Sequence, residues 1–321
     1  MLSLLKKQDH VKNAFTIAFY NLENLFDTNN DPYALDDDFT PDSQRNWNKK
    51  RYYRKLRKLA SVISQIGETE TGHSPDVIGV AEVENKTVLE DLCKERALEK
   101  LAYGVIHFDS PDERGIDVGL LYKKETVQII SSETIPLMIE STEGVRDLTR
   151  DILYVHLALA GEELHLLVNH WPSRREGATS TEYKRLAAAE ANLHKIEEIK
   201  QHFHHPTILV MGDFNDNPES RSLKTLEYAG LKNLTKSLKE RQRGTQNYEF
   251  QWNLFDQILI SKPLENKSRL TYLDADIFDP LFLKIHRGKF KGNPFRTYVG
   301  RKYKGGYSDH FPVYLILQCE K

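Results

Sequence analysis

The sequence predicts an α/β protein built of layers, with a mixed β-sheet system. Three observations lead to this fold class. Short apolar runs between turn residues recur along the chain, two longer segments have helical periodicity, and no internal repeat or coiled-coil heptad is present. Strands that alternate with helices, and are elsewhere joined by shorter loops, are typical of a layered α/β architecture. A composition of 39% hydrophobic and 29% charged residues is that of a protein able to bury a core.

Seven segments are predicted to be strands, because each is short and rich in Val, Ile, Leu or aromatic residues. They comprise residues 15–22, 76–83, 117–123, 164–171, 206–214, 255–261 and 311–317. Two segments are predicted to be helices. Residues 47–67 place Leu56 and Ile63 on one face, and Gly67 is the stop signal. Residues 180–201 begin with a Ser/Thr cap signal and continue through strong helix formers.

Bulk properties narrow the functional classes. The formal net charge of −2 means that attraction to nucleic acid would have to come from a local basic patch. Cys93 and Cys319 have no short pairing pattern, which indicates neither a disulfide framework nor a thiolate metal site and favours a reduced, cytoplasmic setting. The apolar residues before Lys6 are too few for a signal segment or a membrane span. We therefore expect no stable membrane insertion, and a secreted or periplasmic location would require a leader that precedes this sequence.

Two predicted loops have unusual charge. Residues 27–42 contain six Asp and no basic residue, which fits a solvated surface loop, a calcium-binding loop or a gate over a site. Residues 284–304 contain eight Lys or Arg and no acid, interleaved with aromatic residues. Basic side chains can meet phosphates while aromatic rings stack on bases. Alternatively, the aromatic residues anchor an ordinary basic loop to the core.

Most of the predicted strands carry a carboxylate, amide or imidazole group at one end. These residues are Asn21, Glu23 and Asn24; Glu82 and Glu84; Asn169, His170, Ser173 and Arg174; Asp213, Asn215 and Asp216; Asp256; and Ser308, Asp309 and His310. Strand ends in α/β sheets are where side chains converge on an open crevice and ligands bind. Oxygen ligands without cysteine suit a hard cation such as Mg²⁺ or Mn²⁺.

Motifs of several other enzyme classes are missing from the sequence. It contains no HExxH, no GxxxxGK[ST] and no GxSxG, which disfavours a zinc protease, an ATP-driven phosphoryl transferase and a serine hydrolase. What remains is metal-assisted attack of water on a phosphate ester, in which a carboxylate-held cation stabilises the developing charge and a histidine with a carboxylate partner prepares the water.

The motifs YNLEN, DVIGVAEVEN, NHWPSR, GDFND, FDQILIS and SDHFPV occur in this order, and the chain thereby resembles the endonuclease/exonuclease/phosphatase superfamily over residues 15–317. The stretches RGIDVGLLY and YEFQWNLFDQILIS are most similar to bacterial nuclease-like members. The resemblance implies a four-layer α/β sandwich, in which two mixed β-sheets pack face to face with helices outside. It also implies a single catalytic domain over residues 1–321.

The resemblance implies a metal site. Glu82 matches the principal Mg²⁺ ligand, Asp309 is a second or water-mediated ligand, and Asn21 and Glu23 are further members of the set. Mn²⁺ would substitute for Mg²⁺, and Ca²⁺ is a further candidate. The number of metal ions, one or two, stays open.

The resemblance also implies catalytic roles. His310, oriented by Asp256, would act as general base or polarise the phosphate. Asp213 would activate water or handle the leaving group, and Asn215 would bind the phosphate or the nucleophile. His170 would stabilise the scissile phosphate or protonate the leaving oxygen.

Five further positions are candidates for supporting or alternative roles. Arg114 contacts the phosphate or pairs with Asp117, and Asn169 is a further candidate for phosphate contact. Trp171 packs in the core or offers a stacking surface. Glu84 and Asp216 are expected to support their neighbours or to cap turns.

The leading functional hypothesis is a monomeric Mg²⁺-dependent phosphodiesterase that acts on nucleic acid, with DNA as the expected substrate and either internal or terminal cutting. A second hypothesis is a phosphatase or sphingomyelinase-like phosphoesterase that acts on a lipid or small phosphoester. A third is a catalytically silent binding module on the same fold.

Overall fold

Two six-stranded β-sheets form the centre of the computed structural model, which describes residues 10–140, 144–239, 243–266 and 269–320. The strands of the first sheet are, in spatial order, β15 (Leu270–Ile277), β18 (Val313–Cys319), β1 (Ala14–Leu25), β2 (Val77–Val83), β4 (Asp117–Lys123) and β3 (Tyr103–His107). Those of the second are β11 (Leu231–Asn233), β14 (Asp256–Ser261), β10 (Ile208–Asp213), β9 (Glu162–His170), β8 (Ile152–Leu159) and β5 (Val127–Ile135). Both sheets are mixed, because β1 pairs with β2 and β9 with β10 in parallel while the other neighbours are antiparallel.

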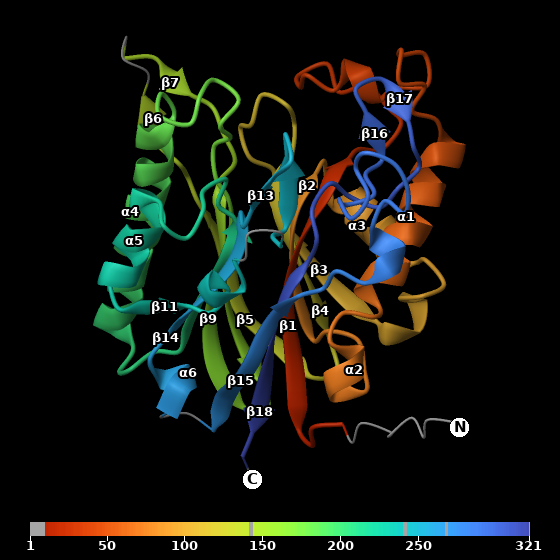
Figure 1. Ribbon diagram of the computed structural model, residues 1–321. Coiled ribbons are helices and arrows are strands. Elements are labelled where there is room, and N and C mark those ends of the chain that lie inside the picture. Colours follow the sequence, from red (N-terminus) through yellow and green to blue (C-terminus); the bar gives the residue numbers. More distant parts are fainter. Residues whose placement is uncertain (1–9, 141–143, 240–242, 267–268, 321) are drawn as a thin grey trace, which may run out of the picture.

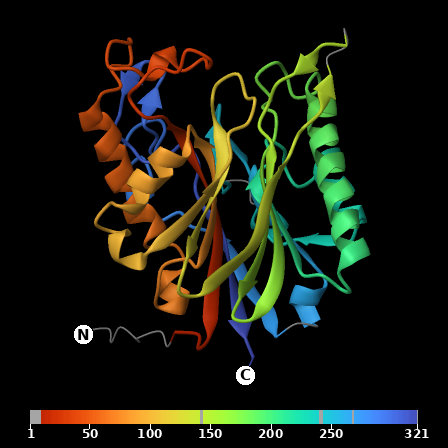
Figure 2. The same cartoon turned by 180° about the vertical axis from the view of Figure 1, so that it is seen from behind.

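Helices cover the outer face of each sheet, as Figures 1 and 2 show. On one side lie α1 (Lys49–Ile63) and α3 (Lys86–Cys93), and on the other α4 (Glu182–His202) and α5 (Arg221–Tyr228). This arrangement confirms the predicted four-layer α/β sandwich. Among the described residues, no helix has the combination of length and apolarity needed to cross a membrane.

The remaining elements are short. They are the helices α2 (Glu68–Thr71) and α6 (Pro263–Asn266), the two-stranded pairs β6 (Ile139–Glu140) with β7 (Arg146–Asp147), β12 (Gln246–Tyr248) with β13 (Gln251–Asn253) and β16 (Tyr298–Val299) with β17 (Lys302–Tyr303), and single 3₁₀ turns at Asp37–Phe39, Glu99–Leu101, Lys236–Leu238 and Leu281–Leu283. The two-stranded pairs lie in the connections at the upper edge of the sandwich, whereas α2 and α6 lie at the opposite edge (Figure 1).

Both predicted helices are present, with local differences. Helix α1 starts after Asn48, whose side chain accepts a hydrogen bond from the backbone N–H of Arg51 over 3.2 Å. It ends at Ile63, before the predicted stop at Gly67. Gly67, with φ +72°, instead directly precedes α2. Helix α4 begins after Thr181, but the Thr181 hydroxyl donates to the carbonyl of Gly177 rather than capping the helix.

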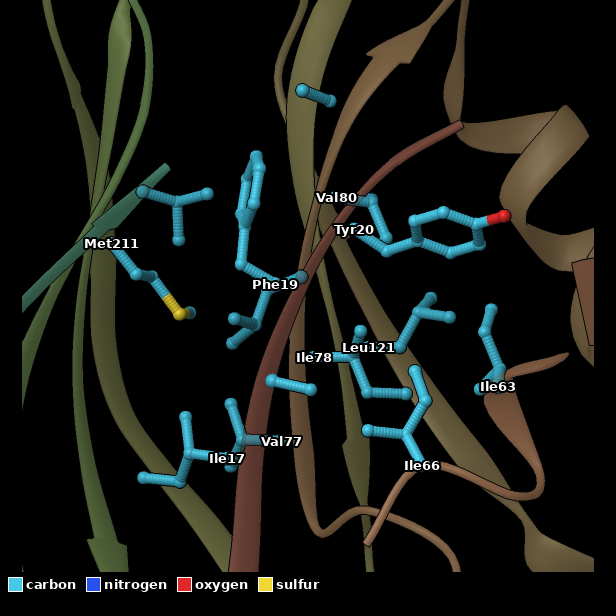
Figure 3. Close-up of a cluster of buried hydrophobic side chains, with 14 of the residues drawn as sticks. Ile17, Phe19, Tyr20, Ile63, Ile66, Val77, Ile78, Val80, Leu121 and Met211 are labelled. Atoms are coloured by element: carbon cyan, nitrogen blue, oxygen red, sulfur yellow. The ribbon is translucent and has the colours of Figure 1, made fainter. Parts of the chain in front are cut away.

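The core between the two sheets follows from the alternation of side chains along each strand. On β1, Phe19 points toward Met211 of the opposite sheet, whereas Tyr20 points to the helical layer near Leu121 and Ile63 (Figure 3). The sheets approach closely at Gly79, where an added Cβ would lie 2.8 Å from the Met211 methyl group. Burying each of these large side chains contributes about 1.5–3 kcal/mol, so the contact between the sheets is a main source of stability.

One edge of the sandwich collects the strand ends that carry polar residues. The parallel pairs β1–β2 and β9–β10 bring their carboxyl ends to this edge, and the antiparallel partners β14 and β18 begin there. In Figure 1 this is the upper edge, opposite the two termini. The sheet topology therefore assembles six sequence-distant segments at one place.

Candidate active site

The upper edge opens into a pocket of about 600 Å³ between the two sheets. Its wall contains the acidic residues Glu82, Asp213 and Asp309, the histidines His170 and His310, the arginines Arg114, Arg174, Arg175 and Arg296, and Asn215. Residues of the β12–β13 hairpin form one side. The fold thus brings together most of the site residues expected from the sequence.

Glu82 reaches the pocket through a β-bulge. The register of β2 against β4 shifts between Ala81 and Val83, and Glu82 has φ +60°. The backbone N–H of Asn24 donates to Glu82 Oε2 over 2.8 Å. Although burial opposes ionisation, the guanidinium charge of Arg114 lowers the pKa of Glu82, so its carboxylate is ionised.

Asp309 is the second ionised carboxylate of the pocket. Burial again opposes ionisation, but the guanidinium of Arg296, whose Nη2 donates to Asp309 Oδ2 over 2.8 Å, lowers the pKa of this group. Asp309 and Glu82 repel each other electrostatically. Two ionised carboxylates on one pocket wall fit a hard divalent cation, which would relieve their repulsion.

His310, which precedes β18, and Asp256, the first residue of β14, form a buried pair. His310 Nδ1 lies 2.7 Å from Asp256 Oδ2, and His310 Nε2 lies 3.8 Å from Asp213 Oδ2. Burial disfavours the imidazolium, but the carboxylates of Asp256 and Asp213 raise the pKa of His310 well above its usual value. These three residues lie close enough to surround an ion, yet an imidazolium has no free lone pair for a metal. Of the acidic residues on the pocket wall, Glu82 and Asp309 are therefore the ones whose carboxylates could hold a cation.

Asp213 is held by hydrogen bonds to both of its oxygens. Oδ2 accepts from Asn21 Nδ2 over 3.0 Å and Oδ1 from the backbone N–H of Asn215 over 2.9 Å. Burial raises the pKa of Asp213 to about 7. Gly212 precedes it because the backbone of β9 passes so closely that an added Cβ would lie 2.2 Å from the carbonyl oxygen of Asn169. The GDFN motif thus combines a tight sheet contact with a fixed carboxylate.

His170 and Arg114 both line the pocket. His170 Nε2 is 4.0 Å from Glu82 Oε1 and 3.9 Å from Asp213 Oδ2, and burial lowers its pKa well below the usual value, which keeps the ring neutral. Arg114 donates to the side-chain oxygen of Asn24 and does not pair with Asp117, which instead accepts from Ser110. Arg114 therefore lines the pocket and does not form the ion pair with Asp117.

Two of the residues predicted to contact the metal or the phosphate, Asn169 and Asn21, do not line the pocket. Asn169 is fully buried, with Nδ2 3.2 Å from Asn192 Oδ1 and its own Oδ1 accepting from Trp171 Nε1, so it is not available for phosphate contact. Asn21 uses its amide on Asp213 and its Oδ1 on the backbone N–H of Glu23, which makes it a positioning residue rather than a metal ligand.

Glu23 departs from its predicted role as a metal ligand. Its Oε1 accepts from Arg296 Nε over 3.3 Å and its Oε2 from the backbone N–H of Thr297 over 2.6 Å. Burial and the neighbouring Asp309 raise the pKa of Glu23 to about 7. Its carboxylate therefore faces Arg296 and a smaller neighbouring pocket instead of Glu82.

The supporting residues behave largely as expected. Trp171 is fully buried and packs edge to face on Phe214 with ring centroids 4.7 Å apart. It is therefore a core residue and offers no stacking surface to a ligand. Asp216 binds the guanidiniums of Arg174 and Arg185 and accepts from the Ser222 hydroxyl. It therefore fixes Arg174, a pocket residue.

The acidic segment 27–42 is partly ordered by its own carboxylates. Asp36 is buried and accepts from the backbone N–H of Asp31 over 3.0 Å, and the backbone N–H of Asp27 donates to Glu84 Oε2. Asp38 pairs with Arg45 over 3.2 Å. These bonds favour a structural loop, in which carboxylates satisfy backbone donors.

The basic segment 284–304 is divided between two roles. Phe295, Tyr298 and Tyr303 pack inward on other rings, as an anchored loop requires, and only Phe290 among its four aromatic residues is exposed. Arg296 is the one basic residue of this segment on the wall of the main pocket. Arg296 and Arg175 were not identified from the sequence. The basic and aromatic composition of segment 284–304 is a signal that could have indicated Arg296. Arg175 directly follows the NHWPSR motif, and a single arginine at that place carries no specific signal.

Comparisons with known proteins agree with this architecture. A family model described as the endonuclease/exonuclease/phosphatase family matches residues 16–319. Among curated proteins, no match was found. A Bacteroides thetaiotaomicron protein of that family has a solved structure that is 18% identical, with a TM-score of 0.62 and coverage of 96% of this chain and 98% of the other.

Two further solved structures are named by activity or ligand. The mannosyl-6-phosphatase of Bacteroides thetaiotaomicron is 17% identical, with a TM-score of 0.60 and coverage of 94% of this chain and 99% of the other. TDP2 of D. rerio, complexed with a single strand DNA product, is 18% identical, with a TM-score of 0.57 and coverage of 95% and 99%. At these identities the likeness concerns the fold.

Proposed function

Because the chain belongs to the endonuclease/exonuclease/phosphatase family, whose members are metal-dependent phosphoester hydrolases, we propose that it hydrolyses phosphodiester bonds of nucleic acid, with DNA as the main substrate. The observation that carries the proposal is the joint placement of two ionised carboxylates, the His310–Asp256 pair and four arginines around one pocket. In this proposal the chain acts as a monomer with a single catalytic domain.

Glu82 and Asp309 would hold the divalent cation, which we propose to be Mg²⁺, with Mn²⁺ as a substitute. When bound, the cation supplies charge stabilisation at the phosphoryl oxygens and lowers the pKa of bound water. The fit rests on the donor set, because both carboxylates are ionised and line the same wall.

The chain's own residues perform the remaining steps. Arg114 and Arg296 contact the phosphate oxygens through guanidinium N–H groups. His310, fixed by Asp256, donates from Nε2 to a non-bridging oxygen, and Asp213 accepts a proton from the attacking water. His170 is neutral and binds the leaving side of the phosphate.

The rim of the pocket supports a nucleic acid substrate. At the tip of the β12–β13 hairpin, Phe250 stacks on Phe290 with ring centroids 5.4 Å apart and planes 3° from parallel, and both rings are about half exposed. Lys289 lies 4.8 Å from the Phe250 centroid. Aromatic rings beside a basic side chain suit the bases and backbone of a single strand, at about 1–3 kcal/mol per stacked base.

The hairpin tip is also strained. Glu249 and Phe250 form the two-residue turn and have φ values of +48° and +66°, a conformation that Asn and Gly adopt more easily. Strained backbone at a pocket rim is typical of functional sites. The strain therefore supports a role for Phe250 outside the packed core.

A small phosphoester is the second candidate substrate. The fold likeness to mannosyl-6-phosphatase is as close as that to TDP2, and four arginines around the pocket would also suit a phosphate monoester dianion. Rates on substrates of the two classes distinguish these candidates.

The test is a hydrolysis panel with plasmid, linear duplex, single-stranded DNA, RNA, abasic DNA, mannose 6-phosphate and sphingomyelin. We expect Mg²⁺-dependent cleavage of DNA that EDTA abolishes and Mn²⁺ restores. Exposed Arg221, which pairs with Glu182 and lines no part of the pocket, gives the control variant Arg221→Gln. Hydrolysis of mannose 6-phosphate without DNA cleavage would replace the nucleic acid proposal, and full DNA cleavage in EDTA would refute the metal mechanism.

A further inference from the structure

A second, smaller pocket of about 160 Å³ lies beside the active-site pocket. Arg175 and Arg296 line both pockets, so the two share part of their wall. Arg45 and Lys55 add two more cationic groups to the smaller pocket, and Glu23 is the carboxylate in its lining. Its volume is several times the ~30 Å³ share of one water molecule, which leaves room for a phosphoryl group.

Arg45 is fixed in place before any ligand binds. Its guanidinium lies over the rings of Phe39 and Tyr298, 4.7 and 5.5 Å from their centroids. Nε and Nη2 contact Asp38, whereas Nη1 has no partner within the described part of the chain. A guanidinium held against two rings loses little conformational entropy when it binds an anion.

Two other cations also keep N–H groups for a ligand. Lys55 is buried, and its Nζ donates to the carbonyl of Glu23 and, over 3.0 Å, to Thr297 Oγ1, which occupies two of its three protons. Arg175 is exposed and forms no hydrogen bond or ion pair with any residue that the structure describes. Its guanidinium is thus available at the junction of the two pockets.

The carboxylate in the lining does not prevent anion binding. Both oxygens of Glu23 accept hydrogen bonds, from Arg296 and from the backbone N–H of Thr297, so its charge is compensated inside the protein wall. Cationic side chains outnumber the carboxylate four to one around the pocket. The electrostatic environment therefore favours an anion with several acceptor oxygens.

We propose that the smaller pocket binds a second phosphoryl group of the substrate, next to the phosphate that is hydrolysed. The inference rests on the proposed phosphodiesterase function, because neighbouring phosphates are joined in a nucleic acid strand. Arg175 and Arg296 lie between the two positions and contact either phosphate. The pocket would thus set where the strand is cut relative to a neighbouring or terminal phosphate.

The test compares a thymidine dinucleotide that has free hydroxyl ends with the same dinucleotide bearing a 5′-terminal or a 3′-terminal phosphate. We expect the wild-type kcat/KM for one phosphorylated form to exceed that for the unphosphorylated form by about tenfold or more, because a hydrogen bond to a charged group contributes a factor of about this size. In Arg45→Gln this ratio should fall close to one. Arg221→Gln is the matched control, since Arg221 is also paired with an acid but lines neither pocket.

Equal kcat/KM for all three dinucleotides in the wild-type protein would overturn the subsite. If the protein cleaves bis(p-nitrophenyl) phosphate but no dinucleotide, the nucleic acid proposal fails. In that case a binding measurement tests separately whether the smaller pocket holds a second phosphoryl group. Calorimetry in EDTA should then show pyrophosphate binding at least about tenfold tighter than orthophosphate, with the difference lost in Arg45→Gln. Equal affinities for the two anions would refute the second phosphoryl position.

Discussion

Replacement of Asp256 by Asn tests the buried His310–Asp256 pair. Asp256 is fully buried, its Oδ2 is 2.7 Å from His310 Nδ1, and its Oδ1 has no hydrogen-bond partner among the described residues. Asn has the same shape, so the side-chain oxygen still accepts from Nδ1 while the negative charge is removed. The change therefore isolates charge from geometry.

The size of the effect follows from the loss of that charge. A hydrogen bond to a charged group contributes about 1.5–3 kcal/mol, against about 0.5–1.5 kcal/mol for a neutral one. The Asn amide would also occupy the place of the unpartnered Oδ1, where the structure offers it no acceptor. A loss of about 1–2.5 kcal/mol in transition-state stabilisation corresponds to a decrease in kcat of about 5- to 70-fold.

The assay is Mg²⁺-dependent hydrolysis of bis(p-nitrophenyl) phosphate, which needs no base recognition, together with circular dichroism to verify folding. Asp279→Asn is the matched control, because Asp279 also pairs with a cation, Lys284 at 2.6 Å, but lies outside the active-site pocket. If Asp256→Asn folds normally and retains kcat within twofold of the wild type, the imidazole does not depend on this carboxylate and the assigned role of the pair is wrong.

Three further predictions concern the metal, the rim and the acid stability. Glu82→Gln should weaken Mg²⁺ binding in calorimetry and lower kcat by more than about 100-fold, because one ionised ligand becomes neutral; unchanged Mg²⁺ affinity would exclude Glu82 as a ligand. Phe250→Ala and Phe290→Ala should each raise KM for a single-stranded oligonucleotide by about fivefold or more without changing that for bis(p-nitrophenyl) phosphate, and equal effects on both substrates would contradict base stacking. Burial lowers the pKa of His165 to about 4, so the unfolded chain binds a proton that the folded chain rejects, and stability present above pH ~6.5 is lost as the pH falls toward 4. Urea unfolding at pH 7 and pH 5 should show a smaller difference in His165→Gln than in the wild type.

The fold class could be predicted because it depends on repeated local patterns. All seven predicted strands are present within a few residues of their expected positions, since each is buried on both faces or nearly so. The strands β3, β5 and β15 were missed. They lie at sheet edges, as does the three-residue strand β11, which was also missed. In β5 and β15, polar residues such as Ser131 and Asp274 alternate with apolar ones and interrupt the apolar run. The buried strand β8 was also missed, although its sequence is almost entirely apolar and carries the same pattern as the predicted strands.

The candidate site could be predicted only at the level of residue types. Glu82, Asp309 and His310, which motifs pointed to, line one pocket, but motif membership does not tell which way a side chain points. Asn169 adjoins His170 in the same motif, and alternation along β9 turns it into the opposite layer, toward Asn192 on α4. Such distinctions require the register of the sheet, which the sequence alone does not provide.

Backbone conformation explains why the remaining site geometry could not be predicted from the sequence. Within the described residues, eleven non-glycine residues have a positive φ, and six of them, Glu23, Asn24, Glu82, Asn215, Glu249 and Phe250, line the two pockets or form the hairpin tip. Asn24 and Asn215 are of a type that adopts a positive φ readily, whereas the three glutamates and Phe250 are not. Each costs on the order of 1 kcal/mol or more and persists because the surrounding hydrogen bonds impose it, as the Asn24 N–H does on Glu82. The strain is concentrated where strands stop following the sheet and turn their side chains into the pocket. The same departures from regular strand geometry that hide the site from sequence patterns are therefore what build it.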